Sequence, residues 1–68
     1  MPVVVYVGQK LKAARTRRLL TQEELADKAG VSAATVVNVE RNKQEPHFRT
    51  IRKLAKALDV DPTELLGE

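Results

Sequence analysis

The sequence contains no cysteine and only one histidine, His47, among its 68 residues. Without cysteine the chain can form neither a disulfide framework nor a thiolate metal site. A single histidine has no second imidazole or thiolate with which to share a metal ion, so we predict no metal site and no cofactor. The lack of cysteine suits a reducing compartment, and we expect the protein in the cytoplasm.

Aromatic side chains and long apolar runs are also scarce. Tyr6 and Phe48 are the only aromatic residues, which argues against a surface that stacks the bases of single-stranded nucleic acid. No apolar run approaches the length of a membrane span, and no signal-peptide pattern is visible in the sequence. We therefore expect a soluble protein without a membrane partner.

Groups that catalyse reactions are missing as well. Ser32 has no base within recognisable reach, and no glycine-rich phosphate loop occurs. The acidic residues Glu23, Glu24 and Asp27 gather at the start of a predicted helix, where the helix dipole favours negative charge. None of them needs a catalytic explanation. We predict that the protein is not an enzyme and has no small-molecule ligand.

What the sequence does contain is a modest excess of positive charge. Twelve Lys and Arg residues oppose nine Asp and Glu residues, for a net charge of +3. This balance permits a polyanionic partner without requiring one. The chain is long enough for one small domain, which buries only about 60% of its unfolded surface, so its stability should be modest.

The most informative stretch is residues 21–40, TQEELADKAGVSAATVVNVE, in which two helical patterns meet at Gly30. Thr21 precedes the first pattern as an N-cap, and Glu24 three residues later completes a capping box. Gly30 follows where the chain must turn left-handed, a conformation that glycine adopts without a Cβ clash. Ser32 then caps the second helix.

The apolar residues of this stretch fit two short helices that cross closely. Ala26 provides the small side chain that a steep crossing needs, and Val36 and Val39 form the inner face of the second helix. The other apolar positions at these intervals are Leu25, Ala29 and Val31. Together they predict a helix-turn-helix. An ordinary corner between two helices of a small bundle is the alternative interpretation.

Three further helices are predicted outside this stretch. One spans residues 8–18, and its inner stripe, at the spacing of helix turns, consists of Val7, Leu11 and Ala14. Another spans residues 48–58, with an apolar stripe of Phe48, Ile51, Leu54, Ala55 and Leu58. The last follows the DPTE sequence at 61–64, a compact helix start, and holds Leu65 and Leu66.

The predicted fold is therefore all-α. It is a bundle of five short helices in residues 7–68, with the helix-turn-helix at the second and third. Residues 1–6 precede it as a short extended arm, whose β-rich sequence has no second strand to pair with in the rest of the chain. A loosely ordered arm leading into the first helix, a strand paired with another chain, and disorder all remain open.

Two polar residues stand at structurally demanding positions. Arg15 falls beside Leu11, near the buried edge of the first helix, where a charge needs a partner. Glu40, at the end of the third helix, is the candidate partner. Asn42 follows that helix where a left-handed residue is needed, and asparagine is the best choice there after glycine.

Four stretches carry a resemblance to a known family. In chain order they read VGQKLKAAR, LTQEELADKAGVSAATV, VERNKQEP and TIRKLAKALDVDPTELL. Through them the segment from Val7 to Leu66 resembles the DNA-binding domain of the Cro and phage-repressor family, also called Xre-like. The resemblance implies a five-helix repressor-like fold and double-stranded operator DNA as the ligand. It also supports the pairing of Arg15 with Glu40.

The resemblance further implies roles for individual residues. Gln22, at the start of the second helix, is placed against a DNA phosphate and sometimes a base edge, and the exposed amides of a helix start suit an anion as well. The loop after the third helix is placed on the DNA backbone through Arg41, Asn42 and Lys43. The third helix is placed in the major groove, where it presents Ala33, Ala34, Thr35, Val37 and Asn38.

The sequence departs from the family pattern at several of these positions. Ala33, Ala34 and Val37 stand where many relatives carry polar side chains, so Asn38 becomes the main expected reader, pairing with adenine while apolar groups touch thymine methyls. Leu19 stands where the family commonly has the glycine that closes the first helix. A left-handed leucine costs about 1 kcal/mol, and we expect this helix to end differently.

Two functional classes remain. The favoured one is a transcriptional regulator, a repressor that binds double-stranded DNA in the nucleoid. We expect a homodimer on a near-palindromic operator with half-sites about 10 bp apart, paired through residues 3–6 or, preferentially, through the segment around Leu65 and Leu66. The alternative is a protein-interaction module, antitoxin-like or an adaptor, whose exposed apolar face consists of Ala33, Ala34 and Val37.

Overall fold

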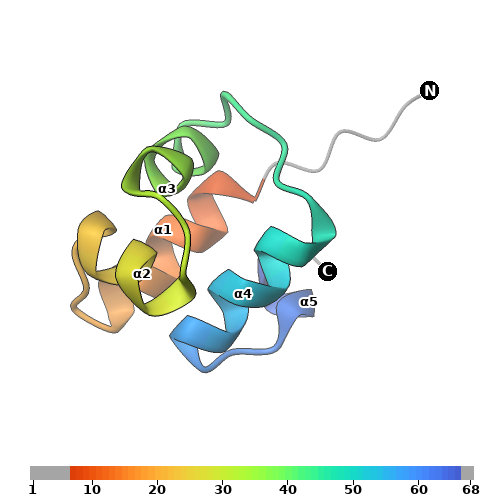
Figure 1. The fold of residues 1–68 in the computed structure, drawn as a ribbon. Helices are drawn as coiled ribbons and strands as arrows, with labels where there is room; N and C mark the ends of the chain where they lie inside the picture. Colours follow the sequence, from red (N-terminus) through yellow and green to blue (C-terminus); the bar gives the residue numbers. More distant parts are fainter. Residues whose placement is uncertain (1–6, 67–68) are drawn as a thin grey trace.

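The computed structural model describes residues 7–66, which form five α-helices and no β-strand (Figure 1). The helices are α1 (Gly8–Arg17), α2 (Gln22–Ala29), α3 (Ala33–Glu40), α4 (Phe48–Leu58) and α5 (Pro62–Leu66). The prediction of an all-α, five-helix fold is confirmed. The predicted arm, residues 1–6, lies outside the described residues. Within residues 7–66, no helix is both long enough and apolar enough to cross a membrane.

The turn between α2 and α3 forms as its sequence predicts. Thr21 Oγ1 accepts a hydrogen bond from the Glu24 amide at 3.0 Å, and the Glu24 side chain accepts one from the Thr21 amide at 2.9 Å. Gly30 has a φ of 71°, and the Ser32 hydroxyl accepts a bond from the Thr35 amide at 3.1 Å. These local bonds set where each helix begins and ends, and the helix-turn-helix prediction is confirmed.

The core lies where the five helices meet. α2 packs against α3 and α4, α1 packs against α3 and α5, and α4 packs against α5. Its most deeply buried large side chains are Val7, Leu11, Leu25, Val36, Val39, Leu54, Leu58 and Leu65. Each of these stabilises the fold by about 1.5–3 kcal/mol relative to an exposed side chain. Ala26, 2% exposed, is the small buried residue of α2 that the helix crossing requires.

The first four helices end in the same way, with one left-handed residue that turns the chain. These residues are Leu19 (φ 58°), Gly30 (71°), Asn42 (58°) and Asp59 (56°). At each end, the amide of the next residue donates to the carbonyl five residues before it, at distances of 2.9 to 3.2 Å. This bond is the mark of a Schellman motif, which satisfies carbonyls that the helix leaves without partners. The left-handed conformation predicted for Asn42 is confirmed.

Leu19 contradicts the expectation that α1 ends differently from its relatives. It adopts the left-handed conformation, and its side chain is 89% exposed. The chain turns here because the Leu20 amide bonds the Arg15 carbonyl at 3.2 Å and the Leu20 side chain packs against the core. This closure outweighs the cost of about 1–2 kcal/mol for a left-handed leucine.

Two further apolar residues lie differently from the predictions. The inner position predicted for Phe48 is wrong, because its side chain is 64% exposed. Phe48 is the first residue of α4, and helical side chains tilt toward the N-terminus, which carries this ring beyond the core. Leu65 belongs to the core with 1% of its surface exposed, so its side chain is not available for pairing two chains. Leu66 is half-buried.

Candidate nucleic-acid interface

Arg15 on α1 and Glu40 at the end of α3 form an ion pair. Nε of Arg15 lies 2.6 Å from Oε2 of Glu40, and Nη2 donates to Oε1 at 3.1 Å. Nη1 donates to the backbone oxygen of Leu20 at 2.7 Å. Only 14% of the Arg15 side chain and 4% of the Glu40 side chain are exposed. The hydrogen bond to Glu40 raises the pKa of the Arg15 guanidinium above its ordinary value, so Arg15 stays charged.

Gln22 joins the same network. It is the first residue of α2, and its Nε2 donates to Oε1 of Glu40 at 3.1 Å. Three helices therefore meet at one carboxylate, which holds Arg15 from α1 and Gln22 from α2 against the end of α3. Because of this contact, the residue predicted to face a phosphate and the helix predicted to read the bases belong to one surface.

Asn42, in the predicted backbone-binding loop, has a structural contact that the local sequence does not reveal. Its Oδ1 accepts a hydrogen bond from the amide of Gly8, the first residue of α1, at 3.2 Å. A Cβ at Gly8 would come 2.5 Å from this oxygen and 2.6 Å from the Glu40 carbonyl, so glycine is required here by close approach. A glycine at the start of a helix indicates a close approach by another segment, but the sequence does not show that this segment contains Asn42, 34 residues away. With Oδ1 engaged, the amide nitrogen is the group of Asn42 suited to a phosphate.

The outward-facing side of α3 is narrow and mostly apolar. Ala34 is exposed, and the other predicted readers are half-buried, namely Ala33, Thr35, Val37 and Asn38. The hydroxyl of Thr35 lies 2.8 Å from that of Ser32, so it already takes part in the cap of its own helix. Within this set, Asn38 is the polar residue whose side chain makes no hydrogen bond in residues 7–66.

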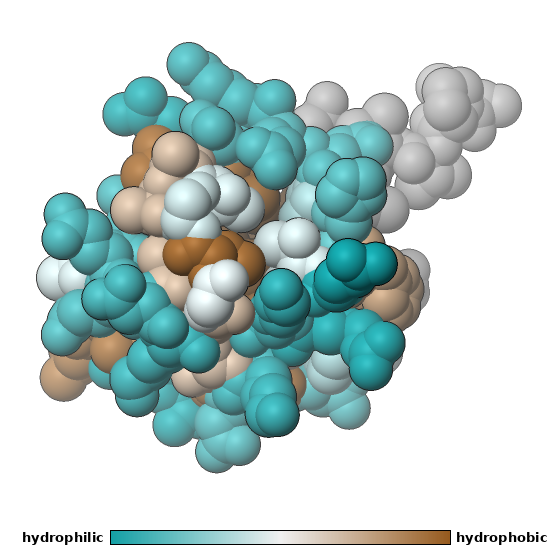
Figure 2. All heavy atoms as spheres, viewed as in Figure 1, coloured by the Kyte–Doolittle hydropathy of each residue, from teal (hydrophilic) through white to brown (hydrophobic). Residues whose placement is uncertain are grey.

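Figure 2 shows how this composition appears on the surface. Brown and pale spheres gather in the middle of the view, over α3 and the turn before it, and teal spheres surround them. The loop that follows α3 is polar, and Arg41, Asn42 and Lys43 are all exposed. The candidate interface thus has an apolar centre with one amide, and cationic and polar groups at the end of α3.

Comparison with known proteins relates this arrangement to a family. The sequence model of the helix-turn-helix family matches residues 11–65 of this chain. The immunity repressor of Bacillus phage phi105 is 39% identical over 62 residues, which are 91% of this chain and 43% of the repressor. This chain spans about half the length of the curated relatives it matches.

Solved structures share the fold over nearly the whole chain. The restriction-modification controller protein C.AhdI from Aeromonas hydrophila superposes with a TM-score of 0.86 and 42% identity, over 91% of this chain and 94% of that one. SinR, described as the master regulator for biofilm formation and solved in complex with DNA, gives a TM-score of 0.85 and 36% identity. That match covers 88% of this chain and 97% of the SinR chain.

Proposed function

Because the chain belongs to the helix-turn-helix family, we propose that it is a sequence-specific DNA-binding transcriptional regulator, a repressor that acts on nucleoid DNA in the cytoplasm. One observation carries the proposal: the Glu40 carboxylate fixes the start of α2 beside the end of α3. A group suited to a phosphate and a helix suited to a groove are thereby built into one unit. The relatives support it, since one is an immunity repressor and another was solved with DNA.

In this proposal α3 enters the major groove and reads an A·T-rich half-site. Asn38 is the main polar reader, because a side-chain amide pairs bidentately with adenine and contributes about 1–3 kcal/mol of discrimination. Thymine methyl groups meet the apolar side chains of Ala33, Ala34 and Val37. Thr35 contributes its methyl group, because its hydroxyl is held by Ser32.

The DNA backbone is held at the two ends of this surface. At the start of α2, Gln22 and the free amides of the helix donate to a phosphate. At the end of α3, the loop supplies Arg41, Lys43 and the amide nitrogen of Asn42. These contacts position the protein, whereas α3 supplies the sequence preference.

We further propose a homodimer on a near-palindromic operator. A single short helix with one amide carries too little information to find one site among the many competing sites of a genome. Two copies multiply the discrimination, and two-fold symmetry places their half-sites about 10 bp apart. Sedimentation of the protein with its DNA tests this arrangement, and one chain per specific site would refute it.

Selection of bound sequences from a random duplex library is the deciding experiment. The proposal expects enrichment of paired A·T-rich half-sites, and Asn38→Ala should relax the preference at one position of each half-site. If the Asn38→Ala variant kept full affinity for the selected sequence, the role of Asn38 in reading the bases would be refuted. No enrichment, with binding that is insensitive to salt, would favour the protein-interaction alternative, because phosphate contacts release counterions and an apolar protein interface does not. The family match does not favour that alternative, and the regulators it includes agree with the prediction that this protein is not an enzyme.

A further inference from the structure

The exposed side of α4 carries four cations and no acidic residue. They are Arg49, Arg52, Lys53 and Lys56, of which Arg49 and Lys56 each lie three or four residues from both Arg52 and Lys53. At this spacing they are neighbours on the helix surface, where like charges repel. Within residues 7–66, none of the four forms a salt bridge. This one helix therefore holds more positive charge than the net +3 of the whole chain, at a cost to its own stability.

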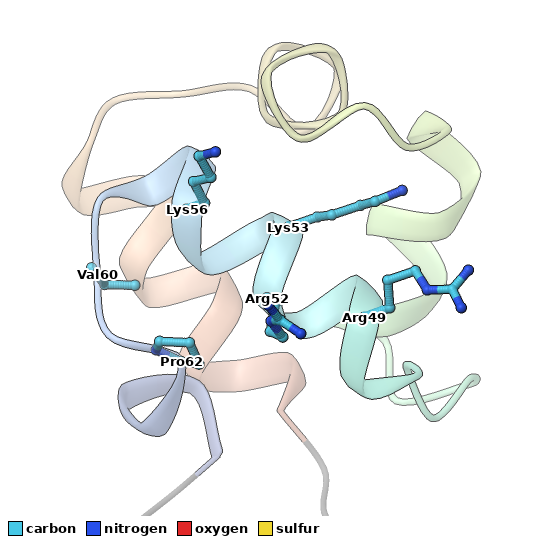
Figure 3. Close-up of a pocket in the computed structure, with 6 residues that line it drawn as sticks. All are labelled: Arg49, Arg52, Lys53, Lys56, Val60 and Pro62. Carbon is cyan, nitrogen blue, oxygen red and sulfur yellow. The ribbon is translucent and has the colours of Figure 1, made fainter.

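These cations border a groove of about 500 Å³. Its remaining lining is apolar and comes from Val60 and Pro62, at the turn from α4 into α5. Figure 3 shows Arg49 and Lys53 extending to the same side of α4, with Val60 and Pro62 at the other end of the groove. A second hollow continues from Lys53 and Lys56 toward the end of α2, where its lining consists of Lys28, Ala29 and Ala57.

The groove is separate from the surface proposed to bind DNA. None of its lining residues belongs to the start of α2, to α3 or to the loop at 41–43. An occupant of the groove would therefore contact residues other than those proposed to hold the DNA. The DNA contacts proposed above do not involve the cations of α4, so they do not explain why four positive charges are gathered on this helix.

We propose that this groove is the docking site for an acidic polypeptide segment of a partner protein, with apolar side chains between its Asp and Glu residues. Charge complementarity selects an anionic partner, and the planar forks of Arg49 and Arg52 match carboxylates. The apolar lining and the aliphatic stems of the long side chains select a partner that also carries apolar groups. The segment binds by laying its apolar side chains on Val60 and Pro62 while its carboxylates meet the cations.

Two other occupants fit less well. A DNA backbone presents phosphates and sugars, but no branched apolar side chain that would cover Val60 and Pro62. A second copy of this chain offers exposed acidic residues at the start of α2 and at the turn into α5. Glu24 is already engaged by the Thr21 amide, and Asp61 by the amide and hydroxyl of Thr63. The start of α2 also adjoins Gln22 and the proposed DNA surface, and the turn into α5 lines the groove itself.

The test uses a short fluorescent peptide whose Leu residues recur every three or four positions, with Glu residues between them. Its affinity is measured by fluorescence anisotropy, and its location by amide chemical shifts of isotope-labelled protein. The proposal expects shifts that cluster on residues 49–62. A variant with Arg49→Gln, Lys53→Gln and Lys56→Gln should bind the peptide about tenfold more weakly, from three exposed ion pairs. The matched control, Lys10→Gln with Lys12→Gln and Arg17→Gln, removes the same charge from α1 and should weaken binding less than about twofold.

Specific comparisons decide the outcome. A peptide with Ser in place of Leu keeps every charge and should bind more weakly, and equal affinity would overturn the role of the apolar lining. Equal losses from the α4 and α1 variants would overturn the site, since net charge alone would then explain binding. If a duplex of unrelated sequence produces larger shifts on α4 than the peptide does, this face is a nucleic-acid surface and the proposal is wrong. Self-association that is lost in the α4 variant would identify a second copy as the occupant and refute it equally.

Discussion

Replacing Leu19 with glycine should stabilise the domain. Leu19 closes α1 at a φ of 58°, where the Cβ of a leucine crowds the following carbonyl at a cost of about 1–2 kcal/mol. Its side chain is 89% exposed, so its removal sacrifices little burial. Glycine relieves the crowding but gains freedom in the unfolded chain, which offsets about 0.5–1 kcal/mol. The expected net gain is about 0.5–1 kcal/mol, or about 2–8 °C in Tm for a domain of this size.

Thermal melts followed by circular dichroism measure this gain, and two variants make the reasoning testable. Leu19→Ala removes almost the same apolar surface but keeps the Cβ, so it should leave Tm nearly unchanged. Gly30→Ala adds a Cβ that meets no atom within 4 Å, and at a φ of 71° its conformational cost of about 1–2 kcal/mol is offset by about 0.5–1 kcal/mol of lost freedom in the unfolded chain, so it should lose about 0.5–1 kcal/mol. A rise in Tm from Leu19→Ala equal to that from Leu19→Gly would refute the conformational argument. No rise from Leu19→Gly would refute it as well.

Five other substitutions probe the packing and the proposed interface. Arg15→Ala or Glu40→Ala should each lower the free energy of unfolding by about 3–5 kcal/mol, because the partner charge is stranded; melting temperatures near that of the wild type would contradict this. Gly8→Ala should cost about 1–3 kcal/mol in urea titrations, since the new methyl group overlaps polar atoms that cannot all move. Lys43→Ala should weaken binding to all DNA sequences alike and flatten the slope of log affinity against log salt by about 0.9, whereas a loss confined to certain sequences would argue against a backbone contact. The pKa of the Glu24 carboxyl lies below its ordinary 4.5, chiefly because the carboxylate accepts a hydrogen bond from the Thr21 amide. The Thr21 side chain lowers it further by a smaller amount. The resulting stability is complete above that ordinary value and is lost as the pH falls through the lowered one, so in acid titrations below pH 4.5 Glu24→Gln should lose less stability than the wild type.

The parts of the fold that the sequence predicts are those encoded by neighbouring residues. The capping box of Thr21 and Glu24, the left-handed Gly30 and the left-handed Asn42 each depend on hydrogen bonds within a few positions. Helical spacing likewise assigns an inner residue such as Leu11 to its buried face. These features are predictable because the residue types and their intervals suffice to make the bonds.

The failures have different physical causes. Phe48 fits the spacing of its helix, but periodicity does not say where along the axis the core ends. Leu19 breaks the local preference because a bond from Leu20 and its packing decide the conformation. Leu65 is buried because α5 folds back onto the bundle, which a pattern of one to two turns does not reveal.

In the candidate site, the sequence indicates a partner for Arg15 because a charge near the core needs one. The hydrogen bonds of Gln22 with Glu40 and of Gly8 with Asn42 join segments 18 and 34 residues apart. Such bonds follow from how helix ends meet in space. No local pattern specifies them.

The bond between Gln22 and Glu40 has a consequence for the entropy of binding. The side-chain amide of Gln22 has two hydrogens, and Glu40 accepts one of them. In the proposed complex the other hydrogen meets a phosphate while the first stays in place, so the side chain is already oriented before the proposed binding. Freezing such a side chain on association ordinarily costs about 0.5–1.5 kcal/mol, and here that ordering happens when the domain folds. A substitution that removes the hydrogen bond between Gln22 and Glu40 should therefore weaken DNA binding even in molecules that remain folded. The reason is that Gln22 regains the rotamers that folding had removed.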